Sequence, residues 1–263
     1  MGWAHIGVLS VLIDNRVPIA GVAGTSVGAL VGSCLCFDRL DVLEEVARSA
    51  TRRRIASYLD VGLRTGSVLR GGRIAREISM KLGDRHLEDS PIPLCLVATD
   101  LVSGSEVRIA SGSVVEAVMA SMAIPGLFPV VRRGENMLVD GGLVANVPMG
   151  AARGLLPDAP MIAVDLMSDY AGHAGGWSSP VGMGRGAVGT VRSSYLVMVA
   201  HMTAMSRTIH SPEVSIDLPI GHIATGDFTR ADELIAIGRH AGLAALPAIV
   251  AVQAARSNAV SGK

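Results

Sequence analysis

The clearest chemistry in this sequence lies at a serine between two glycines, Gly24-Thr25-Ser26-Val27-Gly28. One apolar run precedes the serine and another follows it, which predicts a buried strand, a sharp turn and a buried helix. Such a turn presents the hydroxyl as a nucleophile, and glycines at 24 and 28 let neighbouring backbone come close. The N–H groups that begin the helix, Val27 first, favour negative charge developing beside Ser26. The alternative is that Ser26 caps the helix, where serine is common.

An acidic residue farther along the chain is the second candidate. Asp140 follows a short apolar stretch, residues 137–139, and precedes Gly141 and Gly142. This pattern predicts a carboxylate at the end of a strand, where backbone can approach it closely. The alternative is an aspartate in a turn that accepts hydrogen bonds from its own loop. A serine nucleophile needs a base, and none of the seven histidines lies in a setting that singles it out.

Predicted strands and helices alternate along the chain on either side of Ser26 and Asp140. Strands are predicted at residues 17–23, 92–101, 106–110, 137–139 and 161–166, and helices around 3–15, 26–37, 113–122, 191–207 and 230–256. This alternation predicts an α/β layered fold with a mostly parallel central sheet. The length of 263 residues and the lack of a composition break favour a single domain over residues 1–263.

Composition excludes some classes of partner. Lys and Arg number 23, as do Asp and Glu, and only 3% of the residues are aromatic. Because zero net charge and few aromatic rings remove both the electrostatic and the stacking contributions, we expect no nucleic-acid partner. Cys34, Cys36 and Cys95 match neither a disulfide framework nor a zinc site. They predict buried thiols, no metal centre and a reducing, cytoplasmic location.

The longest uncharged stretch, Val17–Phe37, is long enough for a membrane-spanning helix. A proline and several glycines interrupt it, so a buried strand, turn and helix are favoured instead. The N-terminus has no cationic segment followed by an apolar run and a cleavage site, and no signal peptide is predicted.

Five stretches together resemble the patatin-like phospholipase family, and most of all its bacterial branch related to neuropathy target esterase. They are GWAHIGVL (2–9), GTSVGALVG (24–32), VATDLVSGSEV (97–107), ASMAIPGLFPV (120–130) and LVDGGLVANVPM (138–149). The resemblance implies a three-layer α/β/α fold and hydrolysis of lipid acyl esters by a Ser–Asp dyad without histidine or any cofactor. It assigns the nucleophile of this GXSXG motif to Ser26 and the base to Asp140. Asn146 and Pro148 match the family's Asn-x-Pro and are expected to shape the loop after the acid.

One feature departs from the family pattern. Family members open with a first strand and a glycine-rich loop that ends in Arg-Gly, and the N–H groups of that loop form the oxyanion hole. Here Met1 stands where the arginine would be, and Gly2 is the one residue of the loop present. We therefore expect an N-terminally incomplete domain in which Gly2 and Val27 remain as backbone donors. Loss of one such donor typically lowers turnover by ~10²–10³.

The expected function is that of a serine phospholipase or lysophospholipase, with a lipid ester as substrate. The alternatives are an inactive lipid- or membrane-binding protein of the same fold, and an acyltransferase that uses the same dyad. Because the substrate comes from a lipid surface, we expect peripheral membrane contact. The Gly- and Ser-rich stretch 168–189, with Trp177 and Met183, is one candidate for that contact. The Arg52–Arg54 run favours a solvated helix face over a contact with anionic lipid.

Overall fold

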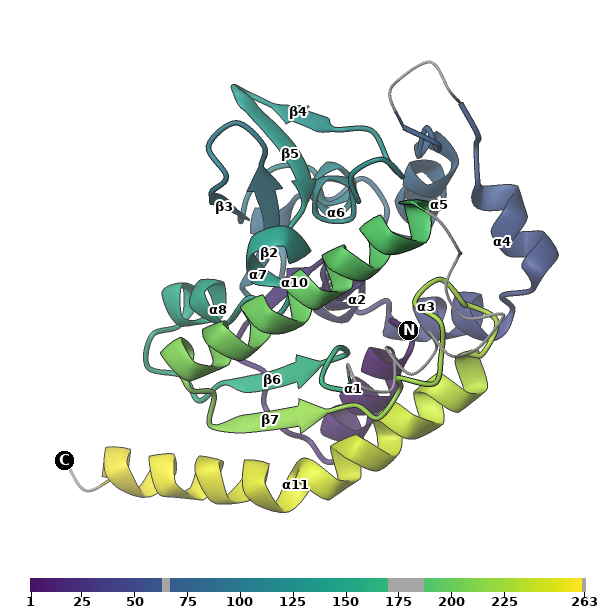
Figure 1. Ribbon diagram of the computed structural model, residues 1–263. Coiled ribbons are helices and arrows are strands. Elements are labelled where there is room, and N and C mark those ends of the chain that lie inside the picture. Colours follow the sequence, from purple (N-terminus) through teal and green to yellow (C-terminus); the bar gives the residue numbers. More distant parts are fainter. Residues whose placement is uncertain (63–66, 170–186, 262–263) are drawn as a thin grey trace.

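A computed structural model describes residues 1–62, 67–169 and 187–261 of the chain. Its strands are β1 (Val22–Thr25), β2 (Leu94–Asp100), β3 (Glu106–Ile109), β4 (Val131–Arg133), β5 (Asn136–Asp140), β6 (Ile162–Asp165) and β7 (Val214–Asp217). Its helices are α1 (Ala4–Asp14), α2 (Val27–Cys36), α3 (Leu40–Arg48), α4 (Arg52–Tyr58), α5 (Gly72–Leu82), the 3₁₀ helix η2 (Leu87–Asp89), α6 (Val114–Ser121), α7 (Gly142–Ala145), α8 (Met149–Leu155), α10 (Ala187–His210) and α11 (Ala231–Ser261). The predicted α/β class is confirmed (Figure 1).

Strand β2 is the centre of the main sheet. β3 pairs with residues 96–99 of β2 and therefore occupies one of its edges. β1 lies opposite residues 94–97 and β5 lies opposite residues 98–100, so these two strands share the other edge. β1 runs parallel to β2 and β5 runs antiparallel to it, so both strands end at neighbouring positions of β2. Thr25 pairs with Val97, and Asp140 pairs with Ala98.

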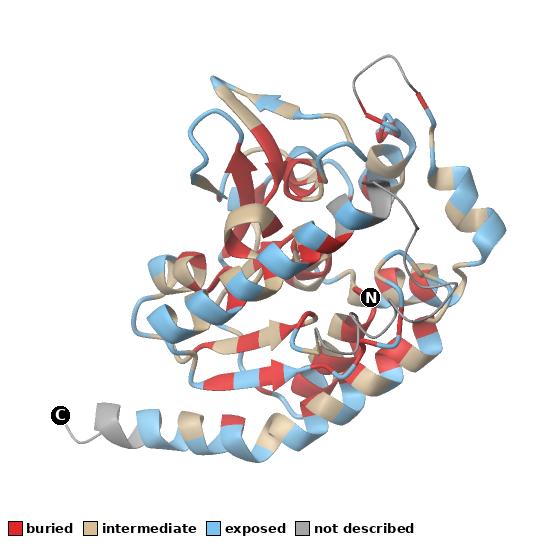
Figure 2. Cartoon of the chain, in the orientation of Figure 1, coloured by how far each residue is buried: buried red, intermediate tan, exposed pale blue. Residues whose placement is uncertain are grey.

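Helices cover both faces of this sheet. α2 and α6 pack on one face, and α7 and α8 pack on the other with α10 over them. Figure 1 shows α10 crossing in front of the sheet, with α2 behind it. In Figure 2 the residues coloured as buried lie mainly where these layers face one another, while residues on the outward faces of the helices are exposed. This arrangement is the predicted three-layer α/β/α architecture.

The sheet pairing is mixed where the sequence predicted a mostly parallel sheet. β1 pairs parallel with β2, and β6 pairs parallel with β7 in a second sheet. β3 and β4 instead join their neighbours through short connections, at residues 101–105 and 134–135. Because a short connection reverses the chain, it allows only antiparallel pairing. Gly134, with a φ of 59°, provides the left-handed backbone that the two-residue β4–β5 turn needs.

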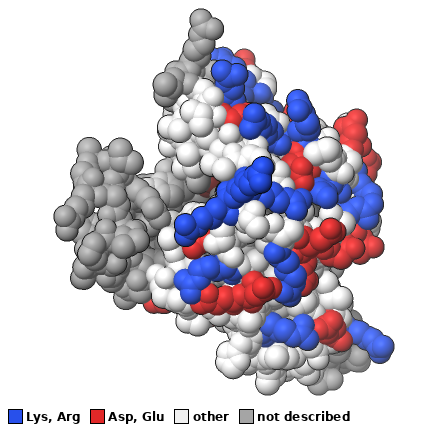
Figure 3. Space-filling model, turned by 90° about the vertical axis from the view of Figure 1, so that its right-hand side faces the viewer, with Lys and Arg blue, Asp and Glu red and all other residues white. Residues whose placement is uncertain are grey.

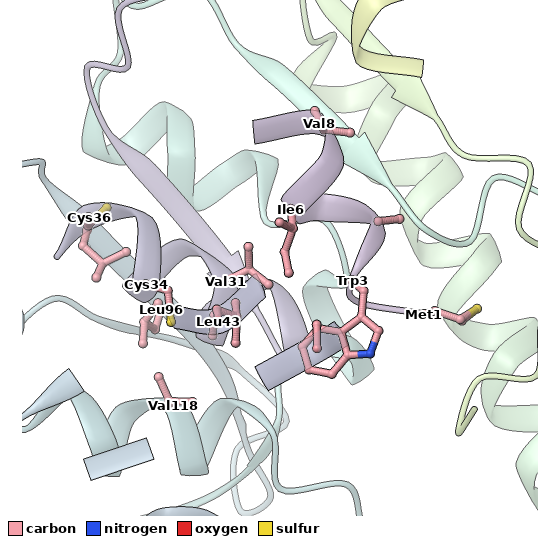
Figure 4. Packing of buried hydrophobic residues seen from close by; sticks show 14 of the residues in the cluster. Met1, Trp3, Ile6, Val8, Val31, Cys34, Cys36, Leu43, Leu96 and Val118 are labelled. Atoms are coloured by element: carbon pink, nitrogen blue, oxygen red, sulfur yellow. The ribbon is translucent and has the colours of Figure 1, made fainter. Parts of the chain in front are cut away.

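The core holds α2 between the sheet and its neighbouring helices. Figure 4 shows Val31, Cys34 and Cys36 of α2 among buried residues of α1, β2 and α6. All three cysteines are buried, as predicted, and no pair of them forms a disulfide. Burial raises the pKa of the Cys34 and Cys36 thiols to about 12, so both are uncharged packing groups at neutral pH.

The stretch Val17–Phe37 forms β1 and α2, as expected, and α2 is too short to cross a membrane. Among the described residues one helix, α11, is long and apolar enough for a span between Ala231 and Arg256. Its first half packs along α1, where Gly7 faces the backbone of Ile235 and Gly238 faces that of Ala4. In the structure α11 is therefore a packed helix of the domain over that half.

Candidate active site

Ser26 lies on a strained turn between β1 and α2. Its φ of 54° and ψ of −125° are unfavourable for a residue with a side chain, and such strain persists only where the surroundings hold it. One constraint is a hydrogen bond from the Ser26 N–H to Ser121 Oγ, 2.8 Å long. The side chain makes no capping hydrogen bond to α2. The helix-cap alternative is therefore excluded, and the hydroxyl points elsewhere.

The two glycines of the motif differ in what they contribute. A Cβ at Gly24 would lie 2.6 Å from the carbonyl oxygen of Gly28, so only glycine fits there. A Cβ at Gly28 would meet no atom within 4 Å among the described residues. The close approach predicted from the sequence thus holds at Gly24 and not at Gly28. The reason is that the Cβ position of Gly24, at the end of β1, faces the first turn of α2, whereas the Cβ position of Gly28 faces away from β1.

Asp140 ends β5 and is almost completely buried, with 1% of its surface exposed. Its Oδ1 accepts a 2.7 Å hydrogen bond from the Gly142 N–H, and its Oδ2 accepts one of 2.6 Å from Ser26 Oγ. Burial raises the pKa of Asp140 to about 6, although these hydrogen bonds oppose the shift. The structure therefore brings Ser26 and Asp140 together as nucleophile and base would need to be.

The glycines after Asp140 allow this packing. A Cβ at Gly141 would collide with the carbonyl oxygen of Val97, so β5 reaches β2 this closely only with glycine here. A Cβ at Gly142 would lie 2.9 Å from Asp140 Oδ1 and 2.8 Å from the hydroxyl of Tyr195. Gly141 hence permits the contact with β2 and Gly142 keeps space beside the carboxylate, in agreement with the close backbone approach predicted from the sequence.

Sequence reasoning missed Tyr195, which lies on α10 and contacts the carboxylate from the other side. Its hydroxyl hydrogen-bonds to Asp140 and lowers the pKa of that carboxyl, opposing part of the effect of burial. Burial raises the pKa of Tyr195 itself, so the hydroxyl keeps its proton and acts as the donor. No motif marks Tyr195 in the sequence, because only the packing of α10 over α7 brings it to the site.

We expect the pH profile of this site to report Asp140 and, through it, Tyr195. Asp140 accepts a proton only as the carboxylate, so kcat/KM should rise through pH 6 and level off above it. Tyr195→Phe removes a donor to the charged form, so the acidic limb should move to higher pH. At pH 6 the variant should lose about tenfold in kcat/KM, the effect of one hydrogen bond to a charged group. Initial rates on a soluble ester across pH 5–9 would measure both effects.

The matched control is Tyr58→Phe, because the Tyr58 hydroxyl contacts Arg54 and not Asp140. The acidic limb of the kcat/KM profile of Tyr58→Phe should coincide with that of the parent protein. A Tyr195→Phe profile that also coincides with the parent would contradict the positioning role of Tyr195.

Two further buried hydroxyls fix the ends of β1 and β5, and the sequence did not reveal their role. Ser121 accepts the Ser26 N–H and donates to the carbonyl oxygen of Val97 at 2.6 Å. Thr99 donates to the Asp140 carbonyl oxygen at 2.9 Å. Both residues lie in stretches that resemble the family, and that is the only signal that could have pointed to them. They lock the backbones of the serine and the aspartate to β2.

The predicted oxyanion donors lie beside the serine. A Cβ at Gly2 would collide with the side chain of Val27, so Gly2 packs directly against the residue that follows Ser26. The N–H of Val27, in the first turn of α2, donates to no acceptor in the part of the chain that the structure describes. His5 contacts the Gly2 carbonyl at 3.2 Å, and burial lowers the pKa of His5 to about 4, so its ring is neutral.

The Asn-x-Pro residues shape the segment after the acid. Asn146 follows α7 and donates to Thr203 Oγ1 of α10 at 3.4 Å, and Pro148 directly precedes α8. The stretch 168–189 with Trp177 and Met183 lies largely outside the described residues. No cluster of metal-binding side chains occurs in residues 1–62, 67–169 and 187–261.

Ser26 and Asp140 both lie on the wall of a large cavity of about 1780 Å³. Apolar side chains dominate its lining, among them Leu30, Met122 and Phe128. The edges of β1 and β6 that carry no strand partner in the described part of the chain also border it. The site is therefore a hydrogen-bonded serine and aspartate on the wall of an apolar space, a setting that suits an aliphatic ligand.

Comparison with known proteins agrees with the geometry. The profile of the patatin-like phospholipases matches residues 1–153. The fold is of the α/β lipid hydrolase class, and the chain belongs to the patatin-like phospholipase family. The family membership predicted from the sequence is confirmed.

Named relatives point to one branch of that family. An NTE family protein of Mycobacterium tuberculosis is 37% identical over 173 residues, covering 66% of this chain and 48% of the relative. A second one from the same species is 35% identical over 172 residues, covering 64% and 29%. The neuropathy target esterase sws of Drosophila melanogaster is 28% identical over 189 residues, covering 67% and 13%. The aligned part thus corresponds to about half or less of the length of these relatives.

Proposed function

We propose that this chain is a serine hydrolase of phospholipid or lysophospholipid acyl esters, with Ser26 as nucleophile and Asp140 as base. The observation that carries the proposal is the 2.6 Å hydrogen bond from Ser26 Oγ to Asp140 Oδ2. Two features support it further. The turn at Ser26 is strained, as in a nucleophile elbow, and the buried carboxylate is a stronger base than an exposed one.

The proposed reaction has two halves. Ser26 Oγ attacks the ester carbonyl carbon while its proton passes to Asp140 Oδ2. The negative charge on the carbonyl oxygen is stabilised by the N–H of Val27 and by the backbone of Gly2. When the carbon–oxygen ester bond breaks, the departing alcohol takes the proton from Asp140 and an acyl-Ser26 ester remains. Water then loses a proton to Asp140, attacks the acyl-enzyme, and the fatty acid leaves as Ser26 regains its proton.

The cavity supports an aliphatic acyl group as the part of the substrate that is bound. Its lining near Ser26 consists mainly of aliphatic side chains, so burial of a fatty acyl chain there is favourable by about 0.8 kcal/mol per CH₂ group. Because such substrates reside in bilayers and micelles, the proposal includes a location at the membrane periphery.

A fluorophosphonate probe tests the proposal directly. It should attach covalently to Ser26, and digestion followed by mass spectrometry should place the adduct on the peptide that contains residue 26. Incubation with phosphatidylcholine or lysophosphatidylcholine should release free fatty acid; transfer of the acyl group to an added alcohol in place of water would instead assign an acyltransferase. Lipid binding without any adduct would contradict the proposal and favour a non-catalytic lipid-binding protein.

A further inference from the structure

We infer that the edge of the cavity formed by α4 and by segments 59–62, 67–69 and 124–128 docks on an anionic lipid surface. Four exposed apolar side chains lie on this edge: Leu59, Val61, Val68 and Leu127, here called the apolar rim. Their exposed fractions are 39%, 67%, 48% and 37%. The inference rests on the proposed function, since it supplies the surface from which a lipid ester reaches Ser26.

Backbone hydrogen bonds hold the three segments of the rim together. The N–H of Gly62 donates to the Val68 carbonyl oxygen at 3.0 Å, and that of Val68 donates to Gly126 at 3.1 Å. The N–H of Leu69 donates to the Leu127 carbonyl oxygen at 2.9 Å. The exposed side chains are therefore neighbours on one surface and not isolated apolar residues, which are common on any protein.

The apolar rim is continuous with the active-site cavity. All four of its residues line the same cavity as Ser26 and Asp140. An acyl chain that leaves a bilayer at the rim thus enters a cavity whose lining is mostly apolar and which contains the site. An exposed apolar residue elsewhere on the molecule, Leu243 on α11 with 48% exposure, does not line this cavity.

Charge indicates which surface the rim contacts. The chain as a whole has no net charge, yet residues 51–82 hold eight basic and two acidic residues. Both acidic groups already have partners. Asp60 accepts the N–H groups of Gly71 and Gly72, and Glu77 is within 3.5 Å of the Tyr58 hydroxyl. The segment that carries the rim is therefore strongly cationic, which favours an anionic surface.

The basic side chains are placed for such a contact. α4 projects from the side of the molecule in Figure 1, and Arg52 and Arg53 on its first turn are exposed. Arg53 forms no ion pair with any described residue, while Arg52 acts on Asp227 through charge alone. Figure 3 views this side, where basic and acidic side chains are interspersed and lie next to uncharged areas. The exposed arginines agree with the solvated helix face that the sequence favoured, and the inference adds that this face contacts anionic lipid.

Vesicle co-sedimentation tests the inference, and Ser26→Ala is used as the parent so that no lipid is hydrolysed. The parent should bind vesicles of phosphatidylcholine with phosphatidylglycerol, bind less as salt increases, and bind phosphatidylcholine alone weakly. Arg52→Glu with Arg53→Glu should lower binding at low salt by at least about tenfold, because each basic residue near an anionic surface contributes about 1 kcal/mol. Val61→Asp with Val68→Asp should also lower it, at both low and high salt.

Leu243→Asp is the matched control, an equally exposed apolar residue outside the cavity, and it should bind like the parent. The inference is overturned if the parent does not bind anionic vesicles, if both double variants bind like the parent, or if Leu243→Asp loses as much binding as the rim variants. A dimer in size-exclusion chromatography that Val61→Asp with Val68→Asp disrupts would also overturn it, and would assign the rim to a second copy of the chain.

Failure of the proposed function is distinguishable from failure of the docking surface. With serine restored at position 26, the Arg52→Glu, Arg53→Glu protein should hydrolyse a soluble p-nitrophenyl ester at the parent rate, because neither arginine lines the cavity. Its hydrolysis of anionic vesicles should fall with its binding. Vesicle binding without hydrolysis of the soluble ester would contradict only the proposed function. Equal hydrolysis of anionic vesicles by both proteins would contradict only the docking surface.

Discussion

Ser26→Ala is expected to lower hydrolysis of a p-nitrophenyl ester by about 10⁵-fold or more, since loss of a nucleophile removes the covalent route altogether. The structure explains why the hydroxyl of Tyr195, which also contacts Asp140, does not replace Ser26 as the nucleophile. The strained turn places the residue 26 side chain against Asp140 Oδ2, whereas burial raises the pKa of Tyr195 and keeps that hydroxyl protonated. Rates of p-nitrophenol release, with free fatty acid release from phospholipid as a second measurement, check the prediction.

The control for this variant is Ser33→Ala, about two turns further along α2. Ser33 is fully buried and donates to the Ala29 carbonyl oxygen within its own helix. It should retain the parent rate and its labelling by a fluorophosphonate. Near-ultraviolet circular dichroism should be the same for both variants. Activity that survives in Ser26→Ala at more than a small fraction of the parent rate would refute the assignment of the nucleophile.

Asp140→Asn is expected to lower kcat/KM by about 10⁴-fold, similar to the loss when an orienting acid of a catalytic triad is replaced by its amide. An amide accepts no proton from Ser26 Oγ, so the hydroxyl remains un-ionised as it attacks. The kinetic pattern separates this from a binding defect. kcat should fall while KM changes little, because Asp140 is buried behind Ser26 and only its Oδ2 faces the reacting atoms.

The Asp140→Asn variant should be at least as stable as the parent protein, although it loses activity. The folded-state pKa of Asp140, about 6, lies above its ordinary value, so the folded protein holds this proton more tightly than the unfolded chain does. The carboxylate therefore weakens the fold as pH rises from about 4 through 6, and the full penalty remains above pH 6. The amide that replaces it in Asp140→Asn is never charged, so at pH 8 the free energy of unfolding of the variant should be no lower than that of the parent.

Asp100→Asn is a suitable control, since Asp100 is also buried and ends β2, but its carboxylate binds Ser103 and the Met137 N–H. It should keep full activity whenever it folds. An Asp140→Asn protein that is inactive and also unfolded at pH 8 would contradict the stability argument. A folded one with undiminished kcat would contradict the role of Asp140 as the base.

Local features of this protein could be predicted from the sequence because short-range patterns determine them. The apolar runs on either side of Ser26 predicted β1 and α2, and the alternation of elements predicted the α/β class. Glycine at 24 followed from the need for a Cβ-free contact at the turn. The same reasoning was less successful at Gly28 and for the direction of the strands. Those features depend on which neighbour a chain segment meets, and spacing along the sequence does not contain that information.

Residue types and their spacing were enough to identify Ser26 and Asp140 as the residues that could react, and to predict the local elements that carry them. That the two meet, although 114 residues separate them, depends on the tertiary structure. They do so because β1 and β5 end side by side on one edge of β2. It also decided the electrostatics, since burial by packed helices raises the pKa of Asp140 and brings Tyr195 to it. Long-range packing sets both the distance and the local dielectric, and neither is a property of a motif.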